Sequence, residues 1–246
     1  MTKLTTVLLL GAGSDIATAL ARKYASLGYG LQLAARNPDN LRRLASDLQI
    51  RYGARASLHP FDATRTDTHQ AFWTSLDPKP DITCCIFGYL GDQKIAEENW
   101  EECEKILITN YVAAVSILNL AAAHYANGQY GCITGISSVA GERGRAGNYF
   151  YGSAKAGFTA YLSGLRNRLS HLRVHVLTVK PGFVYTRMTE GMRLPAPVTA
   201  TPEEVANAIV KAVNKKKNVI YVRWVWRWIM LVIKCIPENI FKKLNL

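Results

Sequence analysis

The sequence predicts an α/β fold, in which a doubly wound parallel sheet of about seven strands carries helices on both faces. Short apolar runs of strand length alternate along the chain with longer segments of helical pattern. The first apolar run leads directly into glycines and then into a helix. Parallel strands joined by right-handed helical crossovers produce this alternation. The 246 residues suffice for one large domain, and no change of composition divides them.

The predicted strands and helices alternate from the N-terminus onward. The candidate strands are Thr6–Leu10, Leu31–Ala35, Ala56–Pro60, Ile82–Phe87, Gly131–Ile136, Val174–Val179 and Val219–Val222. The helical segments between them include Ile16–Leu27, Asn40–Tyr52, Cys103–Ala126 and Tyr151–Ser170. A later helix begins at Thr201, because a threonine N-cap, proline at the first position and Glu204 form a capping box. Residues 183–200, with mixed polarity and two prolines, read as a long loop that covers a site.

The charge of the chain favours anionic partners. Thirty Lys and Arg against 18 Asp and Glu give a formal net charge of +12. A basic protein of this size suits phosphorylated substrates, nucleic acid or an anionic membrane surface. From Lys211 onward there are nine Lys or Arg and one Glu, so the basic character is concentrated towards the C-terminus.

The five cysteines predict neither a metal site nor a disulfide framework. Their number is odd, and no pair has CxxC or metal-ligand spacing. Cys84, Cys85 and Cys132 lie in apolar runs, which is typical of small buried hydrophobes in a reducing compartment. No stretch reaches the ~20 uninterrupted apolar residues that a spanning helix needs.

The sequence LLLGAGSDIATALA places a glycine turn between the first strand and the first helix. Glycine lets the backbone turn tightly and approach a pyrophosphate, and the helix N-terminus offers amide donors and a positive dipole. At the first strand-to-helix turn of an α/β chain, this pattern indicates a Rossmann-type nucleotide site. The residues expected to contact the cofactor there are Gly11, Gly13, Ser14, Asp15 and Ile16.

A second motif carries the chemistry. Tyr151 and Lys155 are four residues apart and therefore share a face of a helix, and Ser138 follows the predicted strand Gly131–Ile136. With the glycine turn, this set resembles the short-chain dehydrogenase/reductase family over nearly the whole chain. The resemblance implies a single NAD(P)-binding domain over residues 1–246 and makes Ser138, Tyr151 and Lys155 the catalytic residues. A lone Tyr-x-x-x-Lys pair would more often be an exposed helix face.

The same resemblance assigns further positions and shows two departures. Asp15 and Ala17 stand where the glycine-rich turn of the family commonly has glycines, and FGYLG at residues 87–91 replaces Asn-Asn-Ala-Gly. Asn110 fits the helix asparagine of the family, which makes it a fourth predicted catalytic residue. The remaining positions that the resemblance assigns to cofactor contact are Asp62 beside adenine, Gly88, Pro181, Gly182 and, at the carboxamide, Thr186.

The residue types suit proton transfer to a ketone. A free tyrosine has a pKa of about 10, too high for efficient transfer near neutrality, and a nearby ammonium would lower it. Lys155 can supply that ammonium and also bond the nicotinamide ribose. Ser138 can hold the substrate oxygen while Tyr151 protonates it and hydride reaches carbon. Asn110 would support a water chain that returns the proton.

Cofactor choice depends on the end of the second strand. An acid there would bond the ribose 2′-hydroxyl and select NAD, whereas here Ala34 and Ala35 precede Arg36. An arginine can pair with a 2′-phosphate, so we expect NADP. NAD remains the alternative if Arg36 is solvated or only stacks on adenine.

A narrower resemblance suggests a substrate. FGYLGD, SSVAGERGRAGNYFYGSAKAG and IPENIFKKL are similar to the decaprenylphosphoryl-2-keto-erythro-pentose reductases. This resemblance implies a keto sugar linked to a polyprenyl phosphate as substrate and a flavin-dependent oxidase as partner. The alternatives are a reductase of a soluble or steroid-like ketone and a non-catalytic nucleotide-sensing partner, against which the intact Ser138, Tyr151 and Lys155 argue.

Residues 224–246 predict an amphipathic C-terminal extension. A helix from Trp224 to Ile236 would end at Pro237, with Arg227 and Lys234 on one side. The other side would carry Val225, Ile229, Val232, Ile233 and Ile236. Such a helix suits an anionic membrane surface, which would place a cytoplasmic enzyme on the inner face of the cell membrane. The alternative is packing in the core or against a second subunit, since we expect a homo-oligomer.

Overall fold

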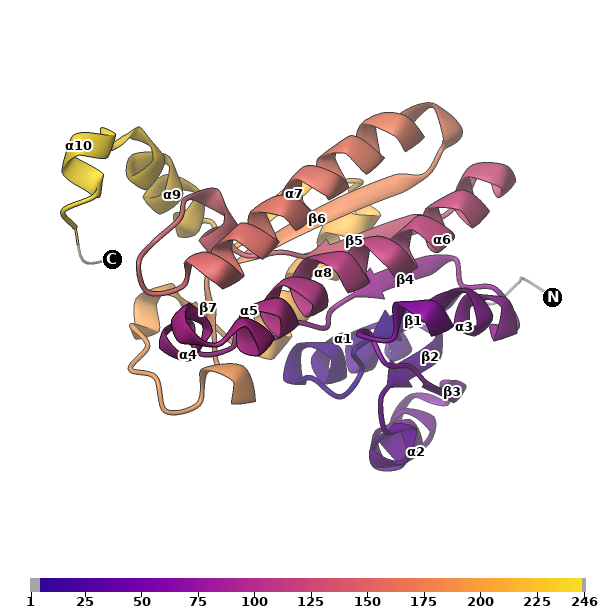
Figure 1. Ribbon diagram of the computed structural model, residues 1–246. Helices are drawn as coiled ribbons and strands as arrows, with labels where there is room; N and C mark the ends of the chain where they lie inside the picture. The colour runs from indigo at the N-terminus through magenta and orange to yellow at the C-terminus, as the bar shows by residue number, and fades with distance from the viewer. Residues whose placement is uncertain (1–4, 245–246) are drawn as a thin grey trace.

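The computed structural model describes residues 5–244 and shows a seven-stranded sheet between two layers of helices (Figure 1). Every strand pairs in parallel, in the order β3-β2-β1-β4-β5-β6-β9. The strands are β1 Thr6–Leu10, β2 Gly30–Ala35, β3 Ala56–Pro60, β4 Ile82–Cys85, β5 Cys132–Ile136, β6 His175–Pro181 and β9 Val219–Val222. The predicted doubly wound α/β fold is therefore confirmed, and each of the seven predicted strands is present.

The helices follow the predicted alternation. They are α1 Asp15–Ala25, α2 Arg42–Tyr52, α3 His69–Ser75, α4 Gln93–Glu98, α5 Trp100–Leu107, α6 Ala113–Gly128, α7 Tyr149–Leu169, α8 Pro202–Asn214, α9 Val225–Cys235 and α10 Glu238–Phe241. The capping box at Thr201 is present, because its hydroxyl accepts from the Glu204 amide and the Glu204 carboxylate accepts from the Thr201 amide. In the predicted loop, Phe183–Val184 (β7) and Thr199–Ala200 (β8) pair as a short second sheet.

The core has two halves because successive side chains of a strand point to opposite faces of the sheet. Along β1, Val7 and Leu9 pack with α1 and α8, whereas Leu8 and Leu10 pack with α6 and α7. All four side chains are fully buried. The apolar run of β1 thus reflects burial on both faces, as expected for a central parallel strand.

The predicted helix Cys103–Ala126 is interrupted. A π-helical turn at Ile108–Val112 separates α5 from α6, and it contains Asn110. The run Trp100–Gly128 is long and apolar enough to cross a membrane by length and composition. Ile117 and Leu118 are nevertheless fully buried against the sheet, so this run serves as a core helix.

The C-terminal helix α9 lies on the body of the fold, and this corrects the predicted orientation of its faces. Trp226 and Met230 are buried, and Val225, Ile229 and Ile233 are partly buried in the same cluster. Three of the five side chains that the sequence assigned to the membrane therefore pack on the protein, whereas Val232 of the same set is 64% exposed. The apolar side chains that stay exposed on α9 are Trp228, Leu231 and Val232, with Trp224 just before it.

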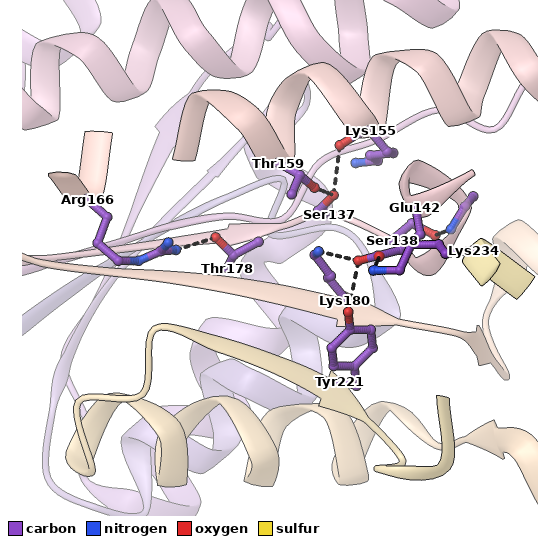
Figure 2. Close-up of polar contacts among 11 residues, drawn as sticks. Ser137, Ser138, Glu142, Lys155, Thr159, Arg166, Thr178, Lys180, Tyr221 and Lys234 are labelled. Carbon is purple, nitrogen blue, oxygen red and sulfur yellow. Dashed lines mark hydrogen bonds and ion pairs between the residues drawn. The ribbon is translucent and has the colours of Figure 1, made fainter. Parts of the chain in front are cut away.

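A buried carboxylate anchors this helix (Figure 2). Glu142, in the 3₁₀ turn Val139–Glu142, is paired with Lys180 of β6 and, at 2.7 Å, with Lys234 of α9. The Tyr221 hydroxyl donates to Glu142 at 2.9 Å. The neighbouring Arg143 donates to the carbonyls of Ile233 and Ile236 at the end of α9, at 2.5 and 2.7 Å.

We expect Glu142→Gln to lower the free energy of unfolding by about 3 kcal/mol near neutral pH, because the poorly exposed Lys180 ammonium loses its counter-charge. Burial raises the pKa of Glu142, but hydrogen bonds from Lys180 and Lys234 outweigh it and hold that pKa below its ordinary value. Its contribution is therefore complete above the unfolded-state pKa of about 4.3 and is lost as pH falls through the lower folded-state pKa.

Urea unfolding of the two proteins at several pH values checks this expectation, and their difference should shrink below about pH 4. Glu238→Gln is the matched control, since Glu238 also pairs with a cation but is 77% exposed. The control should change stability by about 0–1 kcal/mol. Equal losses in both variants would contradict the anchoring role of Glu142.

Candidate active site

A cavity of about 600 Å³ opens at the carboxyl ends of the parallel strands, where open α/β sheets bind their ligands. Its walls come from the start of α1, the loop after β4, the end of β5, the first turns of α7 and the segment after β6. The predicted site residues that line it are Ile16, Gly88, Ser138, Tyr151, Lys155, Pro181, Gly182 and Thr186. Gly11, Gly13, Ser14, Asp15, Arg36, Asp62 and Asn110 are not among the lining residues.

Helix α7 is held against β5 by hydrogen bonds around Lys155 (Figure 2). Lys155 is 3% exposed, and its ammonium donates to the Ile136 carbonyl at 3.1 Å. The Ser137 hydroxyl donates to the Lys155 carbonyl at 3.0 Å and lies 2.6 Å from the Thr159 hydroxyl. Ser137 was missed in the sequence analysis, because nothing in the sequence distinguishes the roles of the adjacent residues Ser137 and Ser138. Ser137 fixes the helix, and both serines line the cavity.

The two titratable groups of the site have shifted pKa values. Burial raises the pKa of Tyr151 to about 12, although a hydrogen bond with Ser138 acts in the lowering direction. Burial lowers the pKa of Lys155 to about 8. The expectation that the ammonium lowers the tyrosine pKa is not met in this structure, where burial dominates and the lowering contribution comes from Ser138. Tyr151 therefore keeps its proton near neutrality, which is the state that a general acid needs.

Asn110 is a buried residue that fixes the loop after β4. Its amide donates to the carbonyls of Tyr89 and Ile106 at 2.6 and 2.8 Å, and its oxygen accepts from the Tyr89 amide at 3.1 Å. A Cβ at Gly88 would lie 3.0 Å from the Asn110 oxygen and 3.4 Å from the Lys155 nitrogen. The loop can pass this close to Lys155 because residue 88 has no side chain. The observed contacts give Asn110 a positioning role, and the predicted water chain remains a prediction.

The glycine turn has the geometry of a nucleotide cradle. Gly11 has φ +88°, and a Cβ there would lie 2.7 Å from the Phe87 amide nitrogen, so only glycine fits. Ser14 caps α1 by accepting from the Ala17 amide at 3.3 Å. The Asp15 carboxylate accepts from the Arg187 amide at 2.8 Å and from its Nε at 3.1 Å. Asp15 thus ties the loop after β6 to the cofactor turn, and Arg187, beside Thr186, is a second residue that the sequence analysis missed.

The remaining predicted contacts lie at neighbouring strand ends. Arg36 is exposed just beyond β2, and Asp62 follows β3. Partial burial raises the pKa of Asp62, but hydrogen bonds from Thr64 and the charge of Arg36 outweigh it and lower that pKa. Gly182 has a further constraint, because a Cβ there would overlap the ring of Trp226 from α9. The C-terminal helix therefore forms part of the cavity wall.

These residues fit a dinucleotide. The close approach at Gly11 leaves backbone beside the N-terminus of α1, where a pyrophosphate is stabilised. Lys155 has no described carboxylate partner and faces the cavity that Ile16 of α1 also lines, so its ammonium suits a ribose hydroxyl. Within residues 5–244, no group of three or more His, Cys, Asp and Glu side chains is placed to hold a metal ion.

Comparisons with known proteins point to one family. Residues 5–196 match the family model described as short chain dehydrogenase. A Mycobacterium tuberculosis protein named as an uncharacterized oxidoreductase is 38% identical over 97% of this chain and 96% of its own length. A ketoacyl reductase from Nostoc sp. is 31% identical over 90% of this chain and 80% of its own. A Sphingobium yanoikuyae short-chain dehydrogenase, solved with NADPH, superposes with TM-score 0.82 at 23% identity, covering 98% and 96% of the two chains.

We expect Tyr151→Phe to lower the rate of ketone reduction by about 10²–10⁴-fold, because the variant loses only the phenolic proton. Cofactor binding should stay nearly unchanged, since the ring and its surroundings remain. Steady-state rates at saturating NADPH, with cofactor affinity from fluorescence titration, test both parts. Near-normal turnover in the variant would contradict the role of Tyr151 as general acid.

We expect Arg36→Ala to weaken NADPH binding by about 1.5–3 kcal/mol, because the variant would lose the charge-assisted bond that we predict to the 2′-phosphate. NADH, which lacks that phosphate, should bind about as before. Titration of both cofactors against wild type and variant measures the difference, with Arg168→Ala on the far part of α7 as a charge control. Equal losses for the two cofactors would show that Arg36 does not read the phosphate and would favour NAD.

Proposed function

Because the chain belongs to the short-chain dehydrogenase family, we propose that it reduces a keto group with NADPH and that this group is the 2-keto function of a pentose linked to a polyprenyl phosphate. The chain is an oxidoreductase of that family. The observation that carries ketone reduction is the meeting of Ser138, Tyr151 and Lys155 in one cavity beside the nucleotide cradle. The preference for NADP over NAD rests on Arg36.

The cofactor would supply hydride, and the residues of this chain manage the proton. Arg36 and the turn at Gly11 would hold the dinucleotide, with Lys155 at the ribose. Ser138 orients the ketone oxygen towards Tyr151, whose raised pKa keeps it protonated until charge develops on that oxygen. As the oxygen becomes an alkoxide, its affinity for a proton exceeds that of the phenolate, and Tyr151 transfers its proton. Because burial lowers the pKa of Lys155 to about 8, its side chain carries a positive charge mainly below that pH.

The lipid-linked substrate is supported by the resemblance of residues 137–157 and by the surroundings of the cavity. Trp226, Met188 and Met192 line the cavity with apolar and polarisable surface. Helix α9 contributes Trp226 to that wall and exposes Trp228 and Leu231 on its outer side. The same helix could thus contact both the substrate and the lipid around it. A flavin-dependent oxidase acting on the same lipid-linked pentose would supply the keto group.

A second candidate is reduction of a ketoacyl thioester. It is favoured by the 31% identity with the Nostoc ketoacyl reductase, which covers most of both chains. NADPH consumption by the purified protein should distinguish the two, with a polyprenyl-phosphate keto-pentose in one reaction and a β-ketoacyl thioester in the other. We expect a higher kcat/KM for the lipid-linked keto sugar, and the reverse preference would overturn this substrate assignment.

The exposed side of α9 leads us to propose that the enzyme works at an anionic membrane. Trp228 and Leu231 are 55% and 47% exposed, and the cations Arg227 on the same helix and Lys242 and Lys243 after α10 are exposed too. Tryptophan favours the lipid interface, and each juxtamembrane cation contributes about 1 kcal/mol, which salt screens. This proposal uses a different face of α9 from the one that the sequence predicted.

We expect Trp228→Ser with Leu231→Ser to abolish co-sedimentation with anionic vesicles while a soluble ketone is still reduced. Binding of the wild type should need anionic lipid and should fall as ionic strength rises. Ile50→Ser is the matched control, because Ile50 is 82% exposed on α2, away from α9 (Figure 1). If the double variant keeps its vesicle binding but changes its oligomeric state, the exposed stripe is a subunit contact.

A further inference from the structure

Two polar side chains in the cavity wall lack partners. Arg145 and Asn148 lie on the segment between the Val139–Glu142 turn and α7, and both line the cavity. The Nε of Arg145 and the Oδ1 of Asn148 are buried, and neither has a hydrogen-bond partner among residues 5–244. Arg145 also forms no ion pair within that part of the chain. Buried polar groups normally have partners, so a ligand group is the expected partner here.

The lack of hydrogen-bond partners is particular to Arg145, because the neighbouring Arg143 has several. Two residues earlier on the same segment, its guanidinium donates to two carbonyls at the end of α9 and to Glu238 at 2.8 Å. It also lies 3.6 Å from the centre of the Phe241 ring. One arginine of this segment is thus committed to structure, while the other faces the cavity with its hydrogen-bonding capacity free.

The charge balance of the cavity favours an anion. Its charged lining residues are Arg145, Lys94, Lys155 and Asp92. Asp92 is committed, because its carboxylate caps α4 by accepting from the Lys94 and Ile95 amides at 2.9 and 3.1 Å. Burial lowers the pKa of Arg145, but a guanidinium stays charged near neutrality. Three cations therefore face the cavity against one capping carboxylate.

The start of α7 acts in the same direction. This 21-residue helix begins at Tyr149, and the side chain of its N-cap Asn148 makes no capping hydrogen bond. The positive end of the helix dipole therefore lies beside Arg145, where it favours a negative group. The cofactor phosphates belong at the separate turn around Gly11, at the start of α1.

We propose that Arg145 forms an oxyanion subsite that binds a phosphoryl or carboxylate group carried by the ketone substrate, while the Asn148 Oδ1 accepts from a hydroxyl of the same substrate. The planar guanidinium fork matches either group with two hydrogen bonds. The assignment rests on the proposed reduction of a ketone in this cavity. For a lipid-linked pentose, the bound group would be the phosphate that joins sugar and lipid.

The test compares a ketopentose phosphate, the same ketopentose without phosphate and a keto acid as substrates with NADPH. Arg145→Met should raise KM for the phosphorylated ketone by about 10–100-fold, the loss expected for a charge-assisted hydrogen bond, and leave KM for the neutral ketone unchanged. Arg145→Lys should restore part of the affinity. Comparison of the phosphate with the keto acid shows which oxyanion the subsite prefers.

The variant Asn148→Asp tests whether the subsite selects a negatively charged substrate group. Aspartate is a good N-cap, so α7 should remain folded, while its negative charge should raise KM for the anionic ketones only. Arg168→Met, on the far part of α7, is the matched control for loss of one positive charge. NADPH affinity should be unchanged in all variants, and a large loss in Arg145→Met would reassign this arginine to the cofactor.

Inorganic phosphate separates failure of the subsite from failure of the proposed function. It should raise the melting temperature of the wild type but not of Arg145→Met. If phosphate binds in this way while no ketone is reduced, the subsite stands and the proposed function fails. If the ketones are reduced and Arg145→Met has the wild-type KM for the phosphorylated one, the subsite is wrong and ketone reduction stands.

Discussion

The site depends on one buried cation. Lys155 reaches the end of β5 with its ammonium, while its own carbonyl accepts from Ser137 of the same segment. The side chain and the backbone carbonyl of Lys155 thus both fix helix α7 to the sheet. Tyr151 lies one turn earlier and Ser138 directly follows Ser137, so these two bonds also fix the spacing of the reacting groups. Lys155 also limits the path of the loop after β4, since Gly88 passes beside the same ammonium.

The sequence was sufficient for features that depend on periodicity and local turns. The seven strands were predicted because burial on both faces leaves uninterrupted apolar runs such as Thr6–Leu10. The helix at Pro202 was predicted because its capping box is a local pattern. The spacing of Tyr151 and Lys155 placed them on one helix face. Strand order then brought Gly88, Ser138 and Thr186 to one cavity, as the family resemblance implied.

Features that depend on contacts between distant segments were not predictable. Nothing local to Arg187 indicates that it meets Asp15, which is 172 residues earlier. The pairing of Glu142 with Lys180 and Lys234 joins three separate elements. The orientation of α9 was predicted wrongly for the same reason: an amphipathic pattern shows that one face is apolar, but the surface it meets is set by the tertiary fold.

The contact between Trp226 and Gly182 has a consequence for biosynthesis. The indole closes the cavity wall from a helix that follows the last strand of the sheet, so the ribosome makes this part after all seven strands. Domains generally fold as units during synthesis. This single domain would thus complete its substrate wall only once α9 has been synthesised. Turnover would therefore begin only after α9 has been made and its indole has packed against Gly182.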